Sequence, residues 1–146
     1  MSYLIDSNCF LRLAEPNSPH RAVVLAAIKN LHSSGETLCY TPQVLAEFWN
    51  VCTRPASARG GLGLSTHETE RKVRLIEKHC RLLPDNLAAF VRWRQIITDY
   101  DIKGVQVHDA RIAASVMVHN IRYLLTFNTG DFERFKQITV VSPSDV

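Results

Sequence analysis

Short apolar segments alternate with longer amphipathic segments along the whole chain. Apolar runs that end at polar residues or prolines predict five strands, over residues 2–5, 37–41, 81–84, 123–127 and 138–141. Between these runs, apolar residues recur at helical spacing and predict helices over 7–14, 19–34, 42–54, 66–80, a segment that begins after Asp85, and 108–119, with a helical turn over 131–136. Strands that alternate with helices indicate an α/β fold, with a central parallel sheet of about five strands and helices on both faces.

Local signals set the ends of several predicted helices. Pro19 and Pro42 stand in the first turn of their helices, where a proline is tolerated because its missing N–H needs no partner there. Ser65 and Asp85 are predicted to cap the helices that follow them. Residues 103–109 are predicted to form a loop that leads into the next helix.

The composition is that of an ordinary globular protein. Of the 146 residues, 46% are hydrophobic and 21% are charged, which excludes a disordered chain. Strands and helices alternate without a linker, a repeat or a low-complexity segment, so we expect one domain over residues 1–146. A formal net charge of +3 is compatible with nucleic-acid binding but does not demonstrate it.

Two further features bear on the cellular setting. No segment approaches the ~18 apolar residues of a membrane span, and the opening MSYLIDSNCF lacks the basic region of a signal peptide. We therefore expect a cytoplasmic protein without membrane association. The four cysteines form no C-x-x-C pair and lie in apolar stretches, which predicts buried, reduced thiols at Cys9, Cys39, Cys52 and Cys80.

Acidic residues recur at positions that a parallel sheet brings to one edge. Asp6 directly follows the first predicted strand, and Asn128 and Asp131 follow the fourth. Asp109 opens the helix that leads back to the fourth strand, and Glu47 lies about 8 Å along the third helix from its start. Ligands of open α/β sheets bind outside the carboxyl ends of the strands. We therefore expect these side chains to converge on one site.

Each acid also has a simpler structural explanation. The helix around Glu47 is apolar over most of its circumference, so its carboxylate needs a partner, and Arg12 or Arg111 could form a salt bridge with it. Asp109 lies in a first helical turn, where a carboxylate is favourable on dipole grounds alone. Asp6 and Asp131 could each cap the helical segment beside it. The set is more informative than any one member, because each has an independent reason to lie at the same edge.

Clustered carboxylates require a compensating cation or bound protons. Two carboxylates about 4 Å apart repel by a few kcal/mol at an effective dielectric constant of about 20. The candidate ligands are all oxygens, without interleaved His or Cys, which favours Mg²⁺ or Mn²⁺ over Zn²⁺. Mg²⁺ held by carboxylates commonly completes its coordination with water and substrate phosphate, which suits hydrolysis of a phosphodiester.

Four segments, in this order, resemble the acidic motifs of PIN domains, and in particular those of VapC-type toxins: LIDSN, LAEFWNVCTRP, HDARIAA and LLTFNTGDF. The resemblance extends over nearly the whole chain. It implies a parallel sheet with helices on both faces, and RNA cleavage that depends on Mg²⁺ or Mn²⁺. It also implies a homodimer and a small antitoxin protein as inhibitor.

The resemblance also implies roles for individual residues. Asp6, Glu47, Asp109 and Asp131 correspond to the acidic quartet, and we expect Asp6 and Asp109 to bind the metal directly. Thr126 is expected to help orient water or phosphate, and Asn128 stands where the last motif often has a polar or acidic residue. Because Asn128 replaces an acid there, the sequence gives little support for a firmly held second metal.

Arg54 and Arg59 are candidate contacts for RNA phosphates, because they flank the glycine-rich loop over 60–63. The loop lacks the Gly-Lys-Ser/Thr ending of a P-loop, and a surface connection with solvated arginines is the simpler interpretation. Two alternatives to a nuclease stay open. An aspartyl-phosphate enzyme would need a lysine after a late strand or an Asp in place of Asn8, and a non-catalytic PIN domain would only bind RNA or a partner.

Overall fold

Five parallel strands form a single sheet at the centre of the computed structural model, which describes residues 1–146. The strand order is β3-β2-β1-β4-β5, with every neighbouring pair parallel. The strands are β1 (Ser2–Ile5), β2 (Thr37–Tyr40), β3 (Arg81–Leu82), β4 (Tyr123–Leu125) and β5 (Thr139–Val141). The predicted five-stranded parallel sheet is therefore confirmed, although four strands are one or two residues shorter than predicted.

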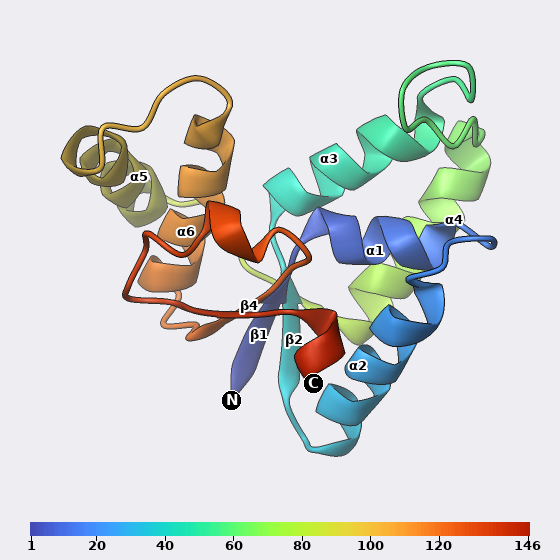
Figure 1. The fold of residues 1–146 in the computed structure, drawn as a ribbon, viewed down its shortest axis with the longest axis horizontal. Helices are drawn as coiled ribbons and strands as arrows, with labels where there is room; N and C mark the ends of the chain where they lie inside the picture. The colour runs from blue at the N-terminus through green and yellow to red at the C-terminus, as the bar shows by residue number, and fades with distance from the viewer.

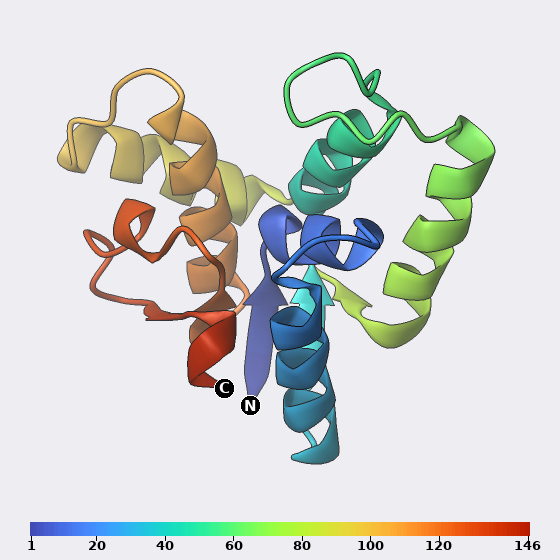
Figure 2. The same cartoon turned by 45° about the vertical axis from the view of Figure 1, so that its right-hand side comes forward.

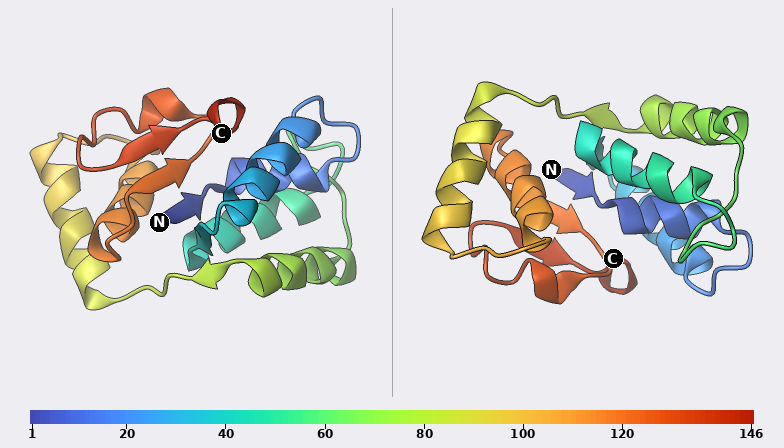
Figure 3. Two further views of the ribbon diagram at one scale, coloured as in Figure 1. Left: turned by 90° about the horizontal axis from the view of Figure 1, so that it is seen from below. Right: turned by 90° about the horizontal axis from the view of Figure 1, so that it is seen from above.

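Six α-helices surround this sheet. They are α1 (Ser7–Ala14), α2 (Arg21–Ser33), α3 (Pro42–Thr53), α4 (Thr66–His79), α5 (Leu87–Asp99) and α6 (Gln106–Val118). Figure 3 shows α1, α2 and α3 on one side of the sheet and α5 and α6 on the other, with α4 beside α3. The chain adds β2 and β3 on one side of β1 and then returns to place β4 on the other, and right-handed crossovers consequently put the two sets of helices on opposite faces.

Side chains fix the starts of most helices. The Ser65 hydroxyl accepts a hydrogen bond from the backbone of Glu68, whose carboxylate accepts from the Ser65 N–H, so the predicted cap of α4 is a full capping box. The Thr41 hydroxyl caps α3 ahead of Pro42. The cap predicted at Asp85 is wrong, because the Asn86 side chain accepts from the Ala89 N–H instead. Asp85 is paired with Arg111 of α6 at 3.2 Å.

Two segments differ from the prediction for identifiable reasons. Helix α6 begins at Gln106, inside the segment 103–109 that was predicted as a loop, and the Trp93 ring N–H donates to the Val107 carbonyl at 2.8 Å. The helical turn predicted over 131–136 lies earlier, as the 3-10 helix η1 (Thr129–Asp131). Phe132 and Phe135 are both buried, so their spacing of three reflects core packing in a turn rather than a helix. A second 3-10 helix, η2 (Pro143–Asp145), was not predicted, although the Ser142 cap and Pro143 in the first turn mark its start.

The core lies against the central strands. Leu4 and Ile5 of β1 and Leu124 and Leu125 of β4 are completely buried within a cluster of 28 apolar residues. All four cysteines are free, as predicted, and Cys80 alone is partly exposed. Burial raises the pKa of the Cys80 thiol to about 12, so it stays protonated at neutral pH. None of the helices has the length and apolar character needed to cross a bilayer.

The topology defines one edge of the sheet as the place for a site. The strand order reverses at β1, so β1 and β4 flank the switch point where open α/β sheets bind ligands. In Figure 1 the first residues of α1 and α3 lie at the carboxyl ends of the strands, and α6 begins on the same side. Figure 2 shows the same elements turned by 45°, with both chain termini at the opposite edge.

Candidate functional site

Asp6 lies at the centre of this edge, directly after β1. Its Oδ1 accepts from the Ser7 N–H at 2.7 Å, which caps α1, and its Oδ2 accepts from the Thr126 hydroxyl at 2.8 Å. Only 7% of Asp6 is exposed. Burial raises the pKa of this carboxyl and the charge of Glu47 raises it further, against the opposing effect of the Thr126 hydrogen bond. Asp6 is thus both a helix cap and a buried, fixed carboxylate.

Thr126 joins the end of β4 to the end of β1. Its Oγ1 donates to Asp6 and accepts from the Asn8 side chain and from the Asn128 N–H, both at 3.0 Å. These three bonds use the one proton and both lone pairs of the hydroxyl. Thr126 is completely buried, and its hydroxyl holds the Asp6 carboxylate, while the predicted orientation of water or phosphate by Thr126 stays a prediction. The Asn128 side chain is exposed and makes no hydrogen bond of its own.

Glu47 of α3 faces the same edge and has no cationic partner. Its Oε2 accepts from the Ser7 hydroxyl at 2.8 Å, and its Oε1 accepts from the Gln43 amide at 3.0 Å. The proposed salt bridges are absent, since Arg12 pairs with Glu15 and Arg111 pairs with Asp85, each at 3.2 Å. The helix is also less buried than predicted, because Ala46 and Asn50 are exposed. Glu47 is thus held by neutral donors alone.

Asp109 brings the four acids into one electrostatic group. It is half-buried in the first turn of α6, and burial raises its pKa to about 6, with the charges of Asp131, Asp6 and Glu47 adding to the rise. None of the five ion pairs in the structure includes any of these acids. We call Asp6, Glu47, Asp109 and Asp131 the carboxylate cluster. Asp131 is its exposed member.

The carboxylate cluster suits a hard divalent cation in its donor chemistry. No group of three or more Asp, Glu, His or Cys side chains is arranged to hold an ion directly. Mg²⁺ does not require such a group, because it usually binds one or two carboxylates and keeps several waters. An all-oxygen donor set with uncompensated negative charge therefore fits Mg²⁺ or Mn²⁺.

Three residues of the site were not among the sequence candidates: Ser7, Asn8 and Gln43. Ser7 and Asn8 directly follow Asp6, so their position at the start of α1 was a usable signal. Gln43 stands four residues before Glu47, a spacing that places two side chains on the same helix face. All three act as hydrogen-bond donors to the acids or to Thr126.

Arg54 and Arg59 lie in a different part of the molecule. The loop between α3 and α4 is at the end of α3 remote from the sheet (Figure 1). There the Arg54 guanidinium donates to the Arg59 carbonyl at 2.7 Å. A side chain at Gly61 would overlap the carbonyl oxygens of Arg54 and Pro55, which explains the glycine. The Arg54 guanidinium therefore helps to close this loop, and RNA contacts by Arg54 and by the exposed Arg59 both stay predictions.

We expect Asp109→Asn to stabilise the metal-free protein at neutral pH. A pKa raised from 3.8 to about 6 penalises the ionised form by at most about 3 kcal/mol, which solvent screening of a half-buried group reduces to about 1–2 kcal/mol. The folded state holds its proton more tightly than the unfolded state, so the penalty develops as pH rises from about 4 through about 6. Thermal unfolding in EDTA should show the variant melting about 2–8 °C higher at pH 7.5 and equal to wild type near pH 4.

Asp145→Asn is the matched control, because Asp145 is exposed in η2 and its side chain makes no hydrogen bond. Its melting temperature should follow that of wild type at both pH values. If Asp109→Asn melts lower than wild type at pH 7.5, Asp109 serves mainly the dipole of α6, and like-charge repulsion is not the dominant effect at this position.

Comparisons with known proteins identify the family and the fold of the chain. The family model for the PIN domain matches residues 3–138, and the chain belongs to the PIN family. No curated protein sequence matches the chain significantly.

Several solved structures share the fold. A chain of VapBC2 from Rickettsia felis, bound to a promoter DNA fragment, has a TM-score of 0.70 at 16% identity, covering 97% of this chain and 98% of that one. FitAcB from Neisseria gonorrhoeae has a TM-score of 0.67 at 19% identity, covering 99% of both chains. VapC20 from Mycobacterium tuberculosis, a toxin that cleaves the sarcin–ricin loop, has a TM-score of 0.66 at 12% identity, covering 91% and 95%. VapC and FitB toxins are thus among the structural neighbours of this chain.

Proposed function

We propose that this chain is a divalent-metal-dependent endoribonuclease and the toxin of a toxin–antitoxin pair. The observation that carries the proposal is the carboxylate cluster at the switch point of the sheet, with a raised Asp109 pKa and no paired cation. A site that only bound RNA phosphates would favour basic side chains over four acids. VapC20, a toxin that cleaves the sarcin–ricin loop, supports the same assignment by likeness of fold.

The residues of the site have separate roles in this proposal. Asp6 and Asp109 bind the cation, and Thr126 and the Ser7 N–H keep the Asp6 carboxylate in one orientation. When bound, Mg²⁺ or Mn²⁺ supplies an activated water and offsets the charge on the reacting phosphate. Glu47 and Asp131 contribute further negative charge and bind the cation either directly or through a water molecule. The free Asn128 amide is exposed at the same edge and can donate to a phosphate oxygen.

Two alternatives were open at the level of sequence. Membership of the PIN family argues against a receiver domain or an aspartyl-phosphate phosphatase, and both oxygens of Asp6 are engaged as acceptors in a buried position. A PIN domain that binds RNA without cutting it is the remaining alternative. Unlike the proposed nuclease, such a domain would produce no RNA fragments when Mg²⁺ or Mn²⁺ is added.

The test is cleavage of RNA by the purified protein. We expect shorter RNA fragments with Mg²⁺ or Mn²⁺, none in EDTA, and recovery when excess Mg²⁺ is restored. Sequencing the fragment ends from a total-RNA digest would identify the target and the cleavage position. Equal cleavage in EDTA would contradict a metal-dependent mechanism, and intact RNA after binding would support the non-catalytic alternative.

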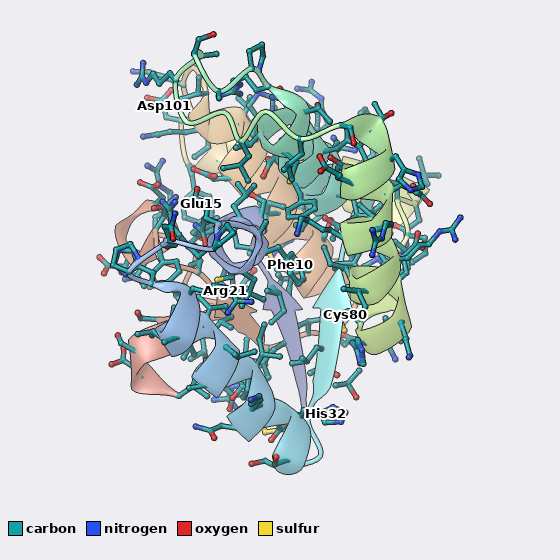
Figure 4. The ribbon with its side chains drawn as sticks, turned by 90° about the vertical axis from the view of Figure 1, so that its right-hand side faces the viewer. Phe10, Glu15, Arg21, His32, Cys80 and Asp101 are labelled. Atoms are coloured by element: carbon teal, nitrogen blue, oxygen red, sulfur yellow. The ribbon has the colours of Figure 1, made fainter.

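An apolar groove provides a surface for the antitoxin in this proposal. Helices α1, α2, α3 and α4 enclose a groove of about 270 Å³, lined mainly by Phe10, Leu13, Leu25, Phe48, Leu75 and Ile76. Figure 4 looks onto this face, with Phe10 and Arg21 labelled between α2 and α4. Arg21 and Lys72 add positive charge to the groove. The matching partner is a helix with an apolar face and acidic flanking residues.

A second copy of this chain is the other proposed partner. Leu87, Phe90 and Val91 of α5 are 77%, 55% and 45% exposed, and their spacing places them on one face of the helix. An exposed apolar stripe of this kind is characteristic of an interaction surface. It supports the homodimer that the family resemblance implies, at a face distinct from the groove on α1–α4.

A further inference from the structure

The Gln43 side chain makes two hydrogen bonds that converge on the carboxylate cluster. Its Nε2 donates to Glu47 Oε1 at 3.0 Å and to the backbone carbonyl of His108 at 2.9 Å. Glu47 belongs to α3, and His108 directly precedes Asp109 in α6. One amide group therefore contacts both the Glu47 carboxylate and the helical turn that carries Asp109.

This contact connects the two faces of the sheet. Helices α1–α3 and helices α5 and α6 lie on opposite sides of it (Figure 3), and the bond from Gln43 to His108 is the only hydrogen bond between a helix of one set and a helix of the other. No other hydrogen bond joins α3, which carries Glu47, directly to α6, which carries Asp109. The remaining links across the site are the strands and the hydrogen bonds of Asp6 and Asn8 to Thr126. If α3 moved away from α6, Glu47 would move away from Asp109. The hydrogen bond from Gln43 to His108 opposes that movement.

The orientation of the Gln43 amide is fixed by chemistry. Both partners of the Nε2 atom are acceptors, so each amide hydrogen is used once, and a flipped amide would place its oxygen against a carboxylate and a carbonyl. Gln43 is only 7% exposed, and its Oε1 is buried without a hydrogen-bond partner. Burial of an unsatisfied oxygen costs free energy of folding. The stability of the fold alone therefore does not explain why position 43 is a glutamine.

We propose that Gln43 is a positioning residue. Its amide holds Glu47 of α3 beside the first turn of α6, and this keeps the carboxylates of the cluster at the spacing that a divalent cation requires. The proposal rests on the metal-dependent function proposed above. Gln43 itself touches neither the cation nor the RNA. Replacement of a residue that orients a metal ligand typically lowers metal affinity or activity by about 10–100-fold.

The loss of Gln43 should leave the fold intact. The His108 carbonyl keeps its place in the hydrogen-bond ladder of α6, and Glu47 keeps the Ser7 hydroxyl at 2.8 Å. Gln43→Met preserves most of the side-chain volume and removes the unsatisfied oxygen together with the two donors. A purely structural role predicts a lower melting temperature, whereas a positioning role predicts weaker metal binding at nearly unchanged stability.

The experiment compares wild type, Gln43→Met and Gln106→Met, in which the same substitution is made at an exposed position in the first turn of α6. Mn²⁺ binding is measured by electron paramagnetic resonance, and the Mg²⁺ concentration for half-maximal thermal stabilisation is measured separately. We expect Gln43→Met to need about 10-fold or more additional cation in both measurements, and Gln106→Met to match wild type. Gln43→Leu serves as the second variant if Gln43→Met folds poorly.

The outcomes separate this proposal from the proposed function. If wild type binds Mn²⁺ and Gln43→Met binds it equally well, the positioning role is wrong and the metal site stands. If wild type binds no Mn²⁺, the proposed metal-dependent function itself fails. A double-mutant cycle with Glu47→Gln should be non-additive in Mn²⁺ affinity, because Gln43 acts through Glu47, and additive effects would overturn the proposal.

Discussion

Asp6→Asn should reduce RNA cleavage by more than about 100-fold while leaving the circular dichroism spectrum unchanged. Asn retains an oxygen for the Ser7 N–H but removes the negative charge that a cation requires. Its amide nitrogen would also meet the Thr126 hydroxyl, whose proton would lose its acceptor. Part of that cost is offset, because the substitution removes a buried charge. Cleavage of a labelled RNA in saturating Mg²⁺ gives the rate.

Two further variants make this result specific. Asp109→Asn should lose cleavage to a similar extent, although it melts at a higher temperature without metal, so loss of activity cannot then be attributed to unfolding. Asp145 lies in η2, next to the C-terminus, which Figure 1 marks at the edge of the sheet opposite the site, so Asp145→Asn should cleave at the wild-type rate. In cells, expression of the wild-type chain should slow growth and Asp6→Asn should not. A toxic Asp6→Asn variant would mean that the harm does not come from cleavage.

The sequence was sufficient to place the acids at one edge, because their positions follow from the alternation of strands and helices. Asp6 after β1 and Asp131 after β4 must lie at carboxyl ends once the sheet is parallel, and the start of α6 must return to the same side. Helix α1 has the predicted bounds because Asp6, the polar residue that directly follows β1, also caps the helix. These features depend only on neighbouring residues and on the alternation of strands and helices along the chain.

The contacts within the site could not be predicted in the same way. Ser7 reaches Glu47 across 40 residues, and Gln43 reaches His108 across 65, so neither pairing leaves a local pattern. The choice of cap at α5 was likewise decided by distant residues. Asp85 and Asn86 are equally suitable caps, and pairing with Arg111 commits Asp85 elsewhere. The salt bridges considered for Glu47 failed because each arginine has a different acid beside it.

Leu75→Glu should abolish inhibition by the antitoxin without affecting RNA cleavage. Leu75 is 59% exposed on α4 and lines the apolar groove, so a charge there costs the free protein little but would be buried without a partner in the complex. We expect binding of the protein encoded by the adjacent gene to weaken by at least about 100-fold, which corresponds to about 3 kcal/mol. Coexpression of that protein should then rescue growth with the wild-type chain but not with the variant.

Leu87→Glu is the matched control for this prediction. It places the same charge at a 77% exposed leucine on α5, outside the groove, and should weaken self-association while leaving the antitoxin bound. Sedimentation of each variant with and without the partner separates the two surfaces. If Leu87→Glu releases the antitoxin and Leu75→Glu retains it, the partner binds on α5, and the groove between α2 and α4 has another role. The placement of the antitoxin on α1–α4 would then be wrong, whereas the carboxylate cluster and its chemistry would be unaffected.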